Sequence, residues 1–310
     1  MLNLMNNERE ELLLGLTAEQ KSISSKYFYD KRGSELFDQI TQVQDYYPTR
    51  IEQKIMRDNI VEICSSLNKD TLLIEPGSGS NKKIRFLLGC TDTIAAYMPI
   101  DVSEAYMQEQ AEDLQADFME LSIHPVSGDY SAGLTSHSAL ADFDSRLVFY
   151  PGSSLGNFSK SKAREILASF ASFVGSEGKL LIGLDLQKPK AILERAYDDS
   201  QGITAEFNLN ALACLNDKFG TDFDLSNFKH LAFYNEAETR IEMHLVSSCD
   251  QRVQVAGQEI FIKEAETICT EYSYKYDIKQ FAADLSDLMT LKQTWMDEKQ
   301  YFSVSLFEFN

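Results

Sequence analysis

The stretch from Thr71 to Arg85, TLLIEPGSGSNKKIR, constrains the possible folds of this chain more than any other. Its first four residues are apolar or β-branched and predict a short buried strand. Pro76 has no N–H to donate, so we expect it to end the strand's hydrogen-bond ladder. The Gly-Ser-Gly sequence at 77–79 predicts a tight turn, after which Ser80 or Asn81 is expected to cap a helix.

A strand, a glycine turn and a helix N-terminus together form the usual cradle for a nucleotide-like ligand in a doubly wound α/β sheet. This turn has no G-x-G-x-x-G pattern, because Lys82 stands where the third glycine would be, and it has no phosphate-loop pattern. The ligand is therefore not expected to be NAD or ATP. An ordinary βα turn would also account for Gly-Ser-Gly taken alone.

Size and charge set further limits. The 310 residues suffice for one large α/β domain, or for a domain of moderate size with a second body attached. A net charge of −19 argues against nucleic-acid binding, since that binding depends on Lys and Arg neutralising phosphates. Anionic membrane surfaces are disfavoured by the same sign, and no apolar run approaches the ~20 residues of a membrane span. We therefore expect a small-molecule ligand, with no nucleic acid and no membrane as partner.

The cysteines and the N-terminus indicate the compartment. Five cysteines are scattered with no C-x-x-C pair: Cys64, Cys90, Cys214, Cys249 and Cys269. Their odd number and spacing predict reduced thiols, not a disulfide framework or a zinc site, and no other metal site is expected. The N-terminus, MLNLMNNEREELL, is acidic and lacks the apolar core of a signal peptide, so we expect a cytoplasmic protein.

Strands and helices are predicted to alternate after this first strand. Further strands are expected at 94–100, 121–126, 146–150 and 179–184, with helices between them and one at 51–67 before the series. This alternation predicts a parallel sheet with right-handed crossovers. Ligands in such sheets lie beyond the carboxyl ends of the strands.

Polar residues are expected at those strand ends. Asp101 can accept hydrogen bonds from a ribose diol or cap the next helix, for which Ser103 is also a candidate. Asp129 and Tyr130 can bracket an adenine, although a turn aspartate would look the same. Asn157 ends the sequence GSSLGN, where it can hold a carboxylate or an amine, or adopt a left-handed turn.

Candidate residues also lie outside this series. Residues 27–50 are dense in aromatic side chains, Tyr29 and Tyr46 among them, and form either a lid over the core or a wall of a small-molecule pocket. A strand predicted at 268–275 places Glu271 and Ser273 on one side. A carboxylate beside a hydroxyl suits a ligand with two N–H groups or a cation, unless this side is a solvated face.

The remaining C-terminal half completes the predicted topology. Residues 240–247 and 252–263 are predicted to pair as a hairpin, and a helix is predicted at 278–291. The last strand ends at Phe309, and we place it at the sheet edge, antiparallel to its neighbour. Asp198-Asp199 is interpreted as a helix cap rather than a metal pair, because no histidine lies at ligand spacing.

A series of motifs runs in order along nearly the whole chain: YFYDKRGSELFDQIT, YYPTR, GSGS, PIDVS, GDY, GSSLGNF, AYDD, GITAEFNLN, RIEMHLVS and TEYSYKY. Together they resemble the amino-acid Nα-methyltransferases typified by the histidine-specific enzyme of ergothioneine biosynthesis. The resemblance implies a class I S-adenosylmethionine-dependent methyltransferase with a Rossmann-like α/β sheet at 52–187 and 276–310. It also implies a smaller α+β substrate-binding domain at 1–51 and 188–275. Pro76 departs from the family, which more often has a small apolar residue there.

The resemblance also implies roles for single residues. Tyr29 would be catalytic and, with Tyr46, would lie near the substrate amine and imidazole. The other implied substrate-binding residues are Asn157 and Tyr197 for the carboxylate, and Glu271, Ser273 and the neighbouring Met243 for the imidazole. The implied contacts of the methyl donor are Gly77, Ser78, Lys83, Asp101, Asp129 and Tyr130.

The implied reaction is methylation of the α-nitrogen of L-histidine, up to the trimethylated betaine hercynine. Imidazole offers two N–H groups when protonated and one when neutral, whereas indole has a single donor, so the Glu271/Ser273 pair favours histidine over tryptophan or tyrosine. Two other classes stay open: an NAD-linked oxidoreductase and a non-catalytic amino-acid-binding relative. A monomer is favoured.

Overall fold

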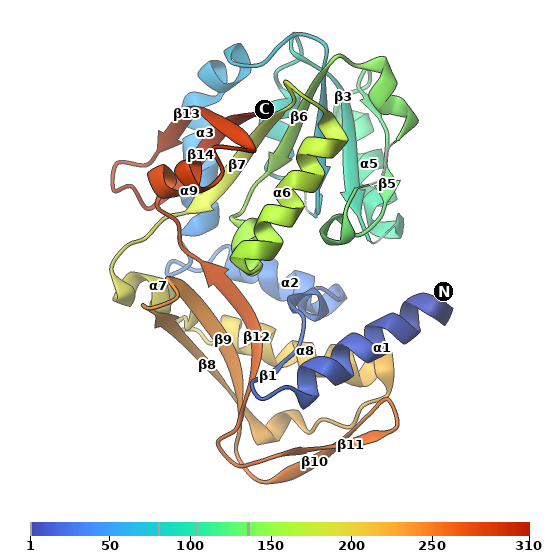
Figure 1. Ribbon diagram of the computed structural model, residues 1–310, viewed down its shortest axis with the longest axis vertical. Coiled ribbons are helices and arrows are strands. Elements are labelled where there is room, and N and C mark those ends of the chain that lie inside the picture. Colours follow the sequence, from blue (N-terminus) through green and yellow to red (C-terminus); the bar gives the residue numbers. More distant parts are fainter. Residues whose placement is uncertain (1, 80, 103, 135–136) are drawn as a thin grey trace. The chain divides into compact units, whose positions relative to one another are not determined.

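The computed structural model describes residues 2–79, 81–102, 104–134 and 137–310 (Figure 1). The chain divides into two compact units. Unit 1 combines the N-terminal residues through Tyr47 with Lys188–Lys275, and unit 2 combines Pro48–Gln187 with Tyr276–Asn310. Among the described residues, no helix is both long and apolar enough to cross a bilayer.

Unit 2 is built around an eight-stranded sheet of order β13-β14-β7-β6-β2-β3-β4, with β5 also paired to β3. Its strands are β2 (Thr71–Pro76), β3 (Ile94–Asp101), β4 (Ser122–Ile123), β5 (Val126–Ser127), β6 (Ser145–Tyr150), β7 (Lys179–Asp185), β13 (Met289–Met296) and β14 (Phe302–Phe309). Its helices are α3 (Pro48–Ser65), α4 (Ile84–Leu88), α5 (Glu104–Asp117), α6 (Lys160–Val174) and α9 (Ile278–Asp284), with 3-10 turns η2 (Tyr130–Ala132), η3 (Ser138–Asp142) and η4 (Ser154–Asn157).

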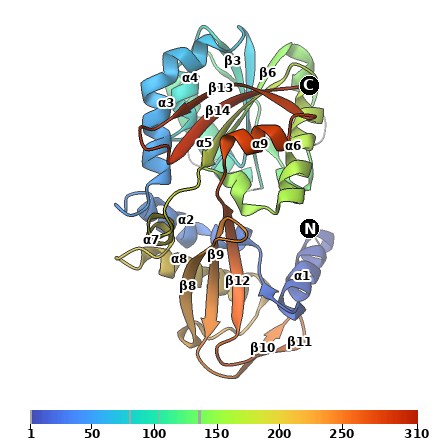
Figure 2. The ribbon, with the colours of Figure 1, turned by 60° about the vertical axis from the view of Figure 1, so that its left-hand side comes forward.

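Strand β2 lies inside the sheet, parallel to β3 on one side and to β6 on the other, and β7 is parallel to β6. Every residue of β2 is buried. Because side chains alternate along a strand, Leu72 and Ile74 pack into a core with α6 and α9, whereas Leu73 packs into a second core with α3, α4 and α5. Helices therefore cover both faces of the sheet (Figures 1 and 2), which confirms the predicted doubly wound α/β fold.

Strand β2 ends at Pro76 as predicted, but the cause differs from the predicted one. Pairing with β6 stops at Ile74, but pairing with β3 continues to Pro76, which lies opposite Ile100. The Gly77 N–H donates to the Ile100 carbonyl at 2.7 Å, so alternation turns the Pro76 nitrogen toward the side where β6 no longer pairs. The missing N–H therefore costs no ladder bond, so β2 ends at Pro76 as expected but not because of the missing donor.

The predicted cap of the next helix is also wrong. Helix α4 begins at Ile84, and its N-cap residue, Lys83, makes no side-chain capping bond. The Asn81 amide instead donates to the Gln110 carbonyl at 2.9 Å, which ties the turn to α5. The other two candidate caps, Ser80 and Ser103, lie outside the described residues.

Two strands of unit 2 differ from their predicted positions. The strand expected at 121–126 is split into β4 and β5, with Pro125, which has no N–H, between them. Strand β14 is antiparallel to β7 as predicted, but it is not at the edge, because β13 pairs along its other side. Residues 289–296 form this edge strand instead of extending α9, since Met289 and Trp295 are buried on a strand whose other residues are more exposed.

Unit 1 contains a four-stranded sheet of order β1-β12-β9-β8 and a separate two-stranded sheet of β10 and β11 (Figure 2). Its strands are β1 (Lys21–Ser22), β8 (Phe228–Asn235), β9 (Arg240–Ser247), β10 (Gln251–Val255), β11 (Gln258–Ile262) and β12 (Thr267–Tyr274). Its helices are α1 (Leu2–Thr17), α2 (Lys31–Ile40), α7 (Lys190–Tyr197) and α8 (Ile203–Phe219), with 3-10 turns η1 (Ser25–Phe28) and η5 (Leu225–Asn227).

The predicted hairpin in unit 1 is wrong. Strand β9 pairs with β8 and β12, not with the stretch that follows it. That stretch folds back on itself as β10 and β11, joined by Ala256 and Gly257, which both have positive φ. A two-residue connection of this kind matches the twist of antiparallel strands, so the local turn decides the pairing.

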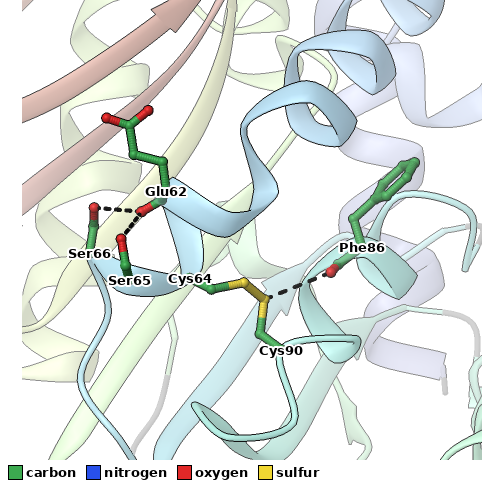
Figure 3. The surroundings of a disulfide bond; sticks show 6 residues. All are labelled: Glu62, Cys64, Ser65, Ser66, Phe86 and Cys90. Carbon is green, nitrogen blue, oxygen red and sulfur yellow. Dashed lines mark hydrogen bonds between the residues drawn. A yellow bond between two sulfur atoms is a disulfide. The ribbon is translucent and has the colours of Figure 1, made fainter.

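The expectation of five reduced cysteines is wrong for one pair. Cys64, near the end of α3, is joined to Cys90, which follows α4, in a disulfide (Figure 3). The two residues are 26 apart in sequence, but their Cα atoms are 6.0 Å apart because α3 and α4 pack side by side. Cys214, Cys249 and Cys269 are free.

Candidate active site

The glycine turn of unit 2 leaves room beside a tyrosine ring. Gly77 has φ of +70° and Gly79 has φ of +33°, a region that residues with side chains rarely adopt. A Cβ on Gly77 would lie 3.0 Å from Cε1 of Tyr130. Ser78 is buried, and its N–H lies 3.3 Å from the Ile100 carbonyl. A bare backbone therefore meets an aromatic ring at the carboxyl ends of β2 and β3.

Glu75 is a buried acid directly before this turn. The Tyr97 hydroxyl donates to its Oε2 at 2.5 Å. Burial raises the pKa of Glu75 to about 8, against the lowering effects of the Tyr97 hydrogen bond and of Lys83. A carboxyl group of this pKa is mostly protonated at neutral pH and can donate a hydrogen bond as well as accept one. Glu75 is not among the site residues predicted from the sequence.

The other acids at the strand ends have different environments. Asp101 is the last residue of β3 and is partly exposed. Asp129 is exposed and caps η2, accepting from the Ser131 N–H at 2.8 Å and from its hydroxyl at 2.6 Å. The turn role considered for Asp129 is therefore real. The Tyr130 hydroxyl accepts from Tyr150 at 3.2 Å, and Cε1 is the atom of its ring nearest to the Cβ position of Gly77.

The loop after β6 is held by a residue that the sequence analysis missed. Glu52 of α3 is buried, and its Oε1 accepts from the Gly152 N–H at 2.7 Å. Its Oε2 lies 2.5 Å from Lys83 Nζ as an ion pair. Glu52 shares the buried face of α3 with Ile55 and Met56, three and four residues on. An acid at helical spacing within an apolar stripe is the signal that would have found it.

Asn157 lies at the end of this same loop. It is the last residue of η4 and is partly buried. The residues of the loop with positive φ are Gly152, at +79°, and Ser153, at +59°, and Asn157 is not one of them, so the alternative that Asn157 adopts a left-handed turn is wrong. The Asn157 amide is thus placed by a helical turn rather than by its own backbone preference.

Unit 1 brings together the other predicted residues. On neighbouring strands, Glu271 lies opposite Met243 and Ser273 lies opposite Ile241, so these side chains share one face of the sheet. Burial raises the pKa of Glu271 to about 7, and the charge of Lys275 opposes that rise.

Lys275 is the second residue that the sequence analysis missed. Its buried ammonium donates to the Ser273 hydroxyl at 2.7 Å and to the Tyr197 hydroxyl at 3.0 Å, and these two hydroxyls are 2.7 Å apart. Alternation along TEYSYK places Lys275 on the same side as Glu271 and Ser273, which is a signal the sequence contains. An acceptor, two hydroxyls and a cation therefore form one cluster.

Aromatic rings connect this cluster to the N-terminal segment. The ring centroids of Tyr46 and Tyr197 are 6.3 Å apart, those of Phe37 and Tyr46 are 6.2 Å apart, and those of Tyr29 and Phe37 are 5.8 Å apart. Tyr29 is 48% exposed and Tyr46 is partly exposed, whereas Phe28 is fully buried. The segment thus combines a ring packed into the core with two tyrosines that are partly exposed.

Comparisons with known proteins identify the family. A family model described as "Histidine-specific methyltransferase, SAM-dependent" matches residues 8–309. The chain belongs to this family. It is 37% identical over 305 residues to histidine N-alpha-methyltransferase of Mycolicibacterium smegmatis and 36% identical over 304 residues to that of Mycobacterium tuberculosis, and each match covers 96% of this chain and 94% of the relative. It is 28% identical over 263 residues to ergothioneine biosynthesis protein 1 of Neurospora crassa, covering 79% of this chain and 30% of that protein.

Membership of this family makes the protein an enzyme that uses S-adenosylmethionine to methylate a small molecule. The prediction of a methyltransferase is confirmed, and the NAD-linked alternative is not supported. The residues of unit 2 fit the cofactor, because the turn at Gly77 keeps clear a space that a Cβ would narrow against Tyr130. Acids at the ends of β2 and β3 lie beside this turn, where a nucleoside is bound in sheets of this kind.

Replacing Glu75 by glutamine tests the buried acid. Its pKa is raised in the folded state, so its stabilising contribution is complete below its ordinary value of 4.5 and is lost as pH rises to about 8. We expect Glu75→Gln, whose amide still accepts from Tyr97, to become progressively more stable relative to the parent protein between pH 5 and 8.5. Urea unfolding across this range measures the difference, with the exposed Glu264→Gln as control. A difference that does not change with pH would contradict the assignment.

Proposed function

We propose that this enzyme methylates the α-nitrogen of L-histidine up to the trimethylated betaine hercynine, as in ergothioneine biosynthesis. Its family and its mycobacterial relatives support histidine as the substrate. The relative from Neurospora crassa supports the pathway. The structural observation that carries the proposal is the cluster of Glu271, Ser273, Tyr197 and Lys275 in unit 1.

This cluster suits an imidazole better than an indole. The Glu271 carboxylate can accept from a ring N–H, while the Ser273 hydroxyl can donate to or accept from the second ring nitrogen. Indole has one N–H and no second nitrogen, so it would leave a buried polar group without a partner, at a cost of about 1–3 kcal/mol. We propose that Met243, opposite Glu271, packs against the ring, that Tyr46 lies along it and that Tyr197 binds the substrate carboxylate.

In unit 2 we assign the binding of S-adenosylmethionine to the strand-end residues. Asp101 is placed to accept from a ribose diol, and Asp129 and Tyr130 are placed to bracket the adenine. The ammonium of Lys83 suits the carboxylate of the cofactor, and the backbone of Gly77 and Ser78 lines the turn. The amide of Asn157, on the loop after β6, suits a substrate carboxylate.

The bound cofactor supplies a methyl group on a sulfonium, so the protein has little leaving-group chemistry to perform. The protein must hold a neutral amine in line with that methyl, and positioning therefore dominates the catalysis. An α-amino group has a reference pKa of about 7.7–8.0 and is mostly protonated near neutral pH. We propose that the accessible Tyr29 phenol orients this amine and helps it to lose its proton.

We also infer that the enzyme acts in the cytoplasm as a monomer, without a nucleic-acid partner. The net charge of −19 supports the absence of a nucleic-acid partner. Three of the five cysteines are free, which favours a reducing compartment, whereas the Cys64–Cys90 disulfide does not.

Mass spectrometry of the purified protein with S-adenosylmethionine and each standard amino acid tests the function. We expect L-histidine alone to gain mass in three successive methyl steps, because only its ring satisfies both Glu271 and Ser273. Methylation of tryptophan or tyrosine in its place would overturn the substrate assignment. Binding of histidine without any mass increase would identify a non-catalytic relative.

Glu271→Ala tests the substrate cluster. We expect kcat/KM for histidine to fall at least roughly tenfold, about 1.4 kcal/mol, because the ring N–H loses its acceptor. The exposed Glu264→Ala serves as matched control. If histidine turnover is unchanged and cofactor binding is weaker, Glu271 belongs to the cofactor pocket and not to the substrate pocket.

Tyr29→Phe tests the proposed catalytic phenol. We expect a rate at neutral pH at least roughly tenfold lower, with the acid limb of the pH–rate profile moved to higher pH, because the amine loses a partner that favours its neutral form. Steady-state rates between pH 6 and 9.5 measure both effects. An unchanged rate and profile would remove Tyr29 from the mechanism.

A further inference from the structure

Glu52 connects three segments of unit 2. It lies on α3 and is only 1% exposed, and each of its carboxylate oxygens contacts a different segment. One oxygen accepts from the Gly152 N–H at 2.7 Å, and the other lies 2.5 Å from Lys83 Nζ. Lys83 directly precedes α4, at the end of the glycine turn, and Gly152 begins the loop after β6. One buried carboxylate thus holds two of the loops at the carboxyl ends of the strands.

Two glycines make room for this arrangement. A Cβ on Gly183, inside β7, would lie 2.0 Å from Glu52 Oε1, so no other residue fits there without moving the carboxylate. A Cβ on Gly152, whose φ is +79°, would lie 3.1 Å from Lys83 Nζ. Glycine inside a strand weakens the strand, because it loses more conformational freedom on folding than other residues and has no side chain to pack. Gly183 therefore makes β7 locally less stable, but it leaves the space in which the Glu52 carboxylate lies beside the Lys83 ammonium.

The charges explain why the pair persists. A carboxylate buried without a partner is costly, so Glu52 keeps the Lys83 ammonium close whether or not a ligand is present. The Lys83 side chain is still 18% exposed, and an ammonium carries three donors. Lys83 can therefore contact Glu52 on one side and present donors to a ligand on the other.

We propose that Glu52 is a positioning residue for the cofactor: it orients the Lys83 ammonium to bind the carboxylate of S-adenosylmethionine, and it anchors the loop that leads to Asn157. This inference rests on the proposed role of Lys83 but not on the identity of the methylated amino acid. The two carboxylate oxygens of Glu52 contact the Gly152 N–H and the Lys83 ammonium, so its effect on the cofactor passes through Lys83. Without the Glu52 charge, the Lys83 ammonium loses its ion-pair partner.

Calorimetric binding of S-adenosylmethionine to the full-length protein tests this inference without any turnover. We expect Glu52→Gln to weaken binding about tenfold, because the amide still accepts from Gly152 but no longer attracts Lys83. Asp58→Asn, on the exposed side of the same helix, is the matched control and should bind as the parent does. Glu52→Asp keeps the charge one methylene farther from Lys83, should also weaken binding, and replaces the glutamine variant if that variant does not fold.

A double-mutant cycle with Lys83→Met separates positioning from general damage to the fold. If Glu52 acts through Lys83, Glu52→Gln will cause no further loss of affinity in the Lys83→Met background. Additive losses, or unchanged or tighter binding by Glu52→Gln alone, would overturn the inference. A parent protein that binds the cofactor but does not methylate histidine would refute the proposed substrate and leave this inference standing.

Discussion

The burial of β2 on both faces is the constraint on which unit 2 depends. A strand with helices on both sides must satisfy its backbone through its neighbours, and β2 does so by parallel pairing with β3 and β6. Where β6 stops pairing, Pro76 removes a donor that would have had no partner on that side. The chain then leaves the sheet at Gly77, where positive φ allows a sharp turn. The edge of the sheet to which we assign the cofactor follows from the end of this one strand.

Polar groups buried near this edge are each stabilised by a specific partner. Glu75 is bonded by Tyr97 and is kept mostly protonated, whereas Glu52 stays beside the ammonium of Lys83. Burial is the main cause of the raised pKa of Glu75, and it outweighs the lowering effects of the Tyr97 hydrogen bond and of the nearby Lys83 charge. Acids with shifted pKa values or with buried ion-pair partners concentrate at functional sites, because burial strengthens the electrostatic interactions that catalysis and binding depend on.

In unit 1 the polar groups are positioned mainly by side-chain alternation along a strand. Alternation along β12 puts Glu271 and Ser273 on one face, Lys275 follows directly after the strand and donates to Ser273, and the end of α7 adds the Tyr197 hydroxyl. Because the ammonium only donates, both hydroxyl oxygens accept from it, which limits the directions left for their own protons. Packing of aromatic rings extends this order outward to Tyr29, whose phenol remains accessible.

The sequence by itself determined the features that depend on local period and on turn residues. These include the alternation of strands and helices between residues 71 and 184, the glycine turn at 77–79, and the shared side of Glu271 and Ser273, since side-chain alternation and glycine conformation are short-range properties. Only the tertiary structure decided that β13 lies outside β14, that Cys64 meets Cys90, and that Glu52 reaches both Lys83 and Gly152. Those pairings join residues distant in sequence. These contacts depend on which faces of the sheet and helices are buried against each other in the folded protein, and no local sequence pattern predicts them.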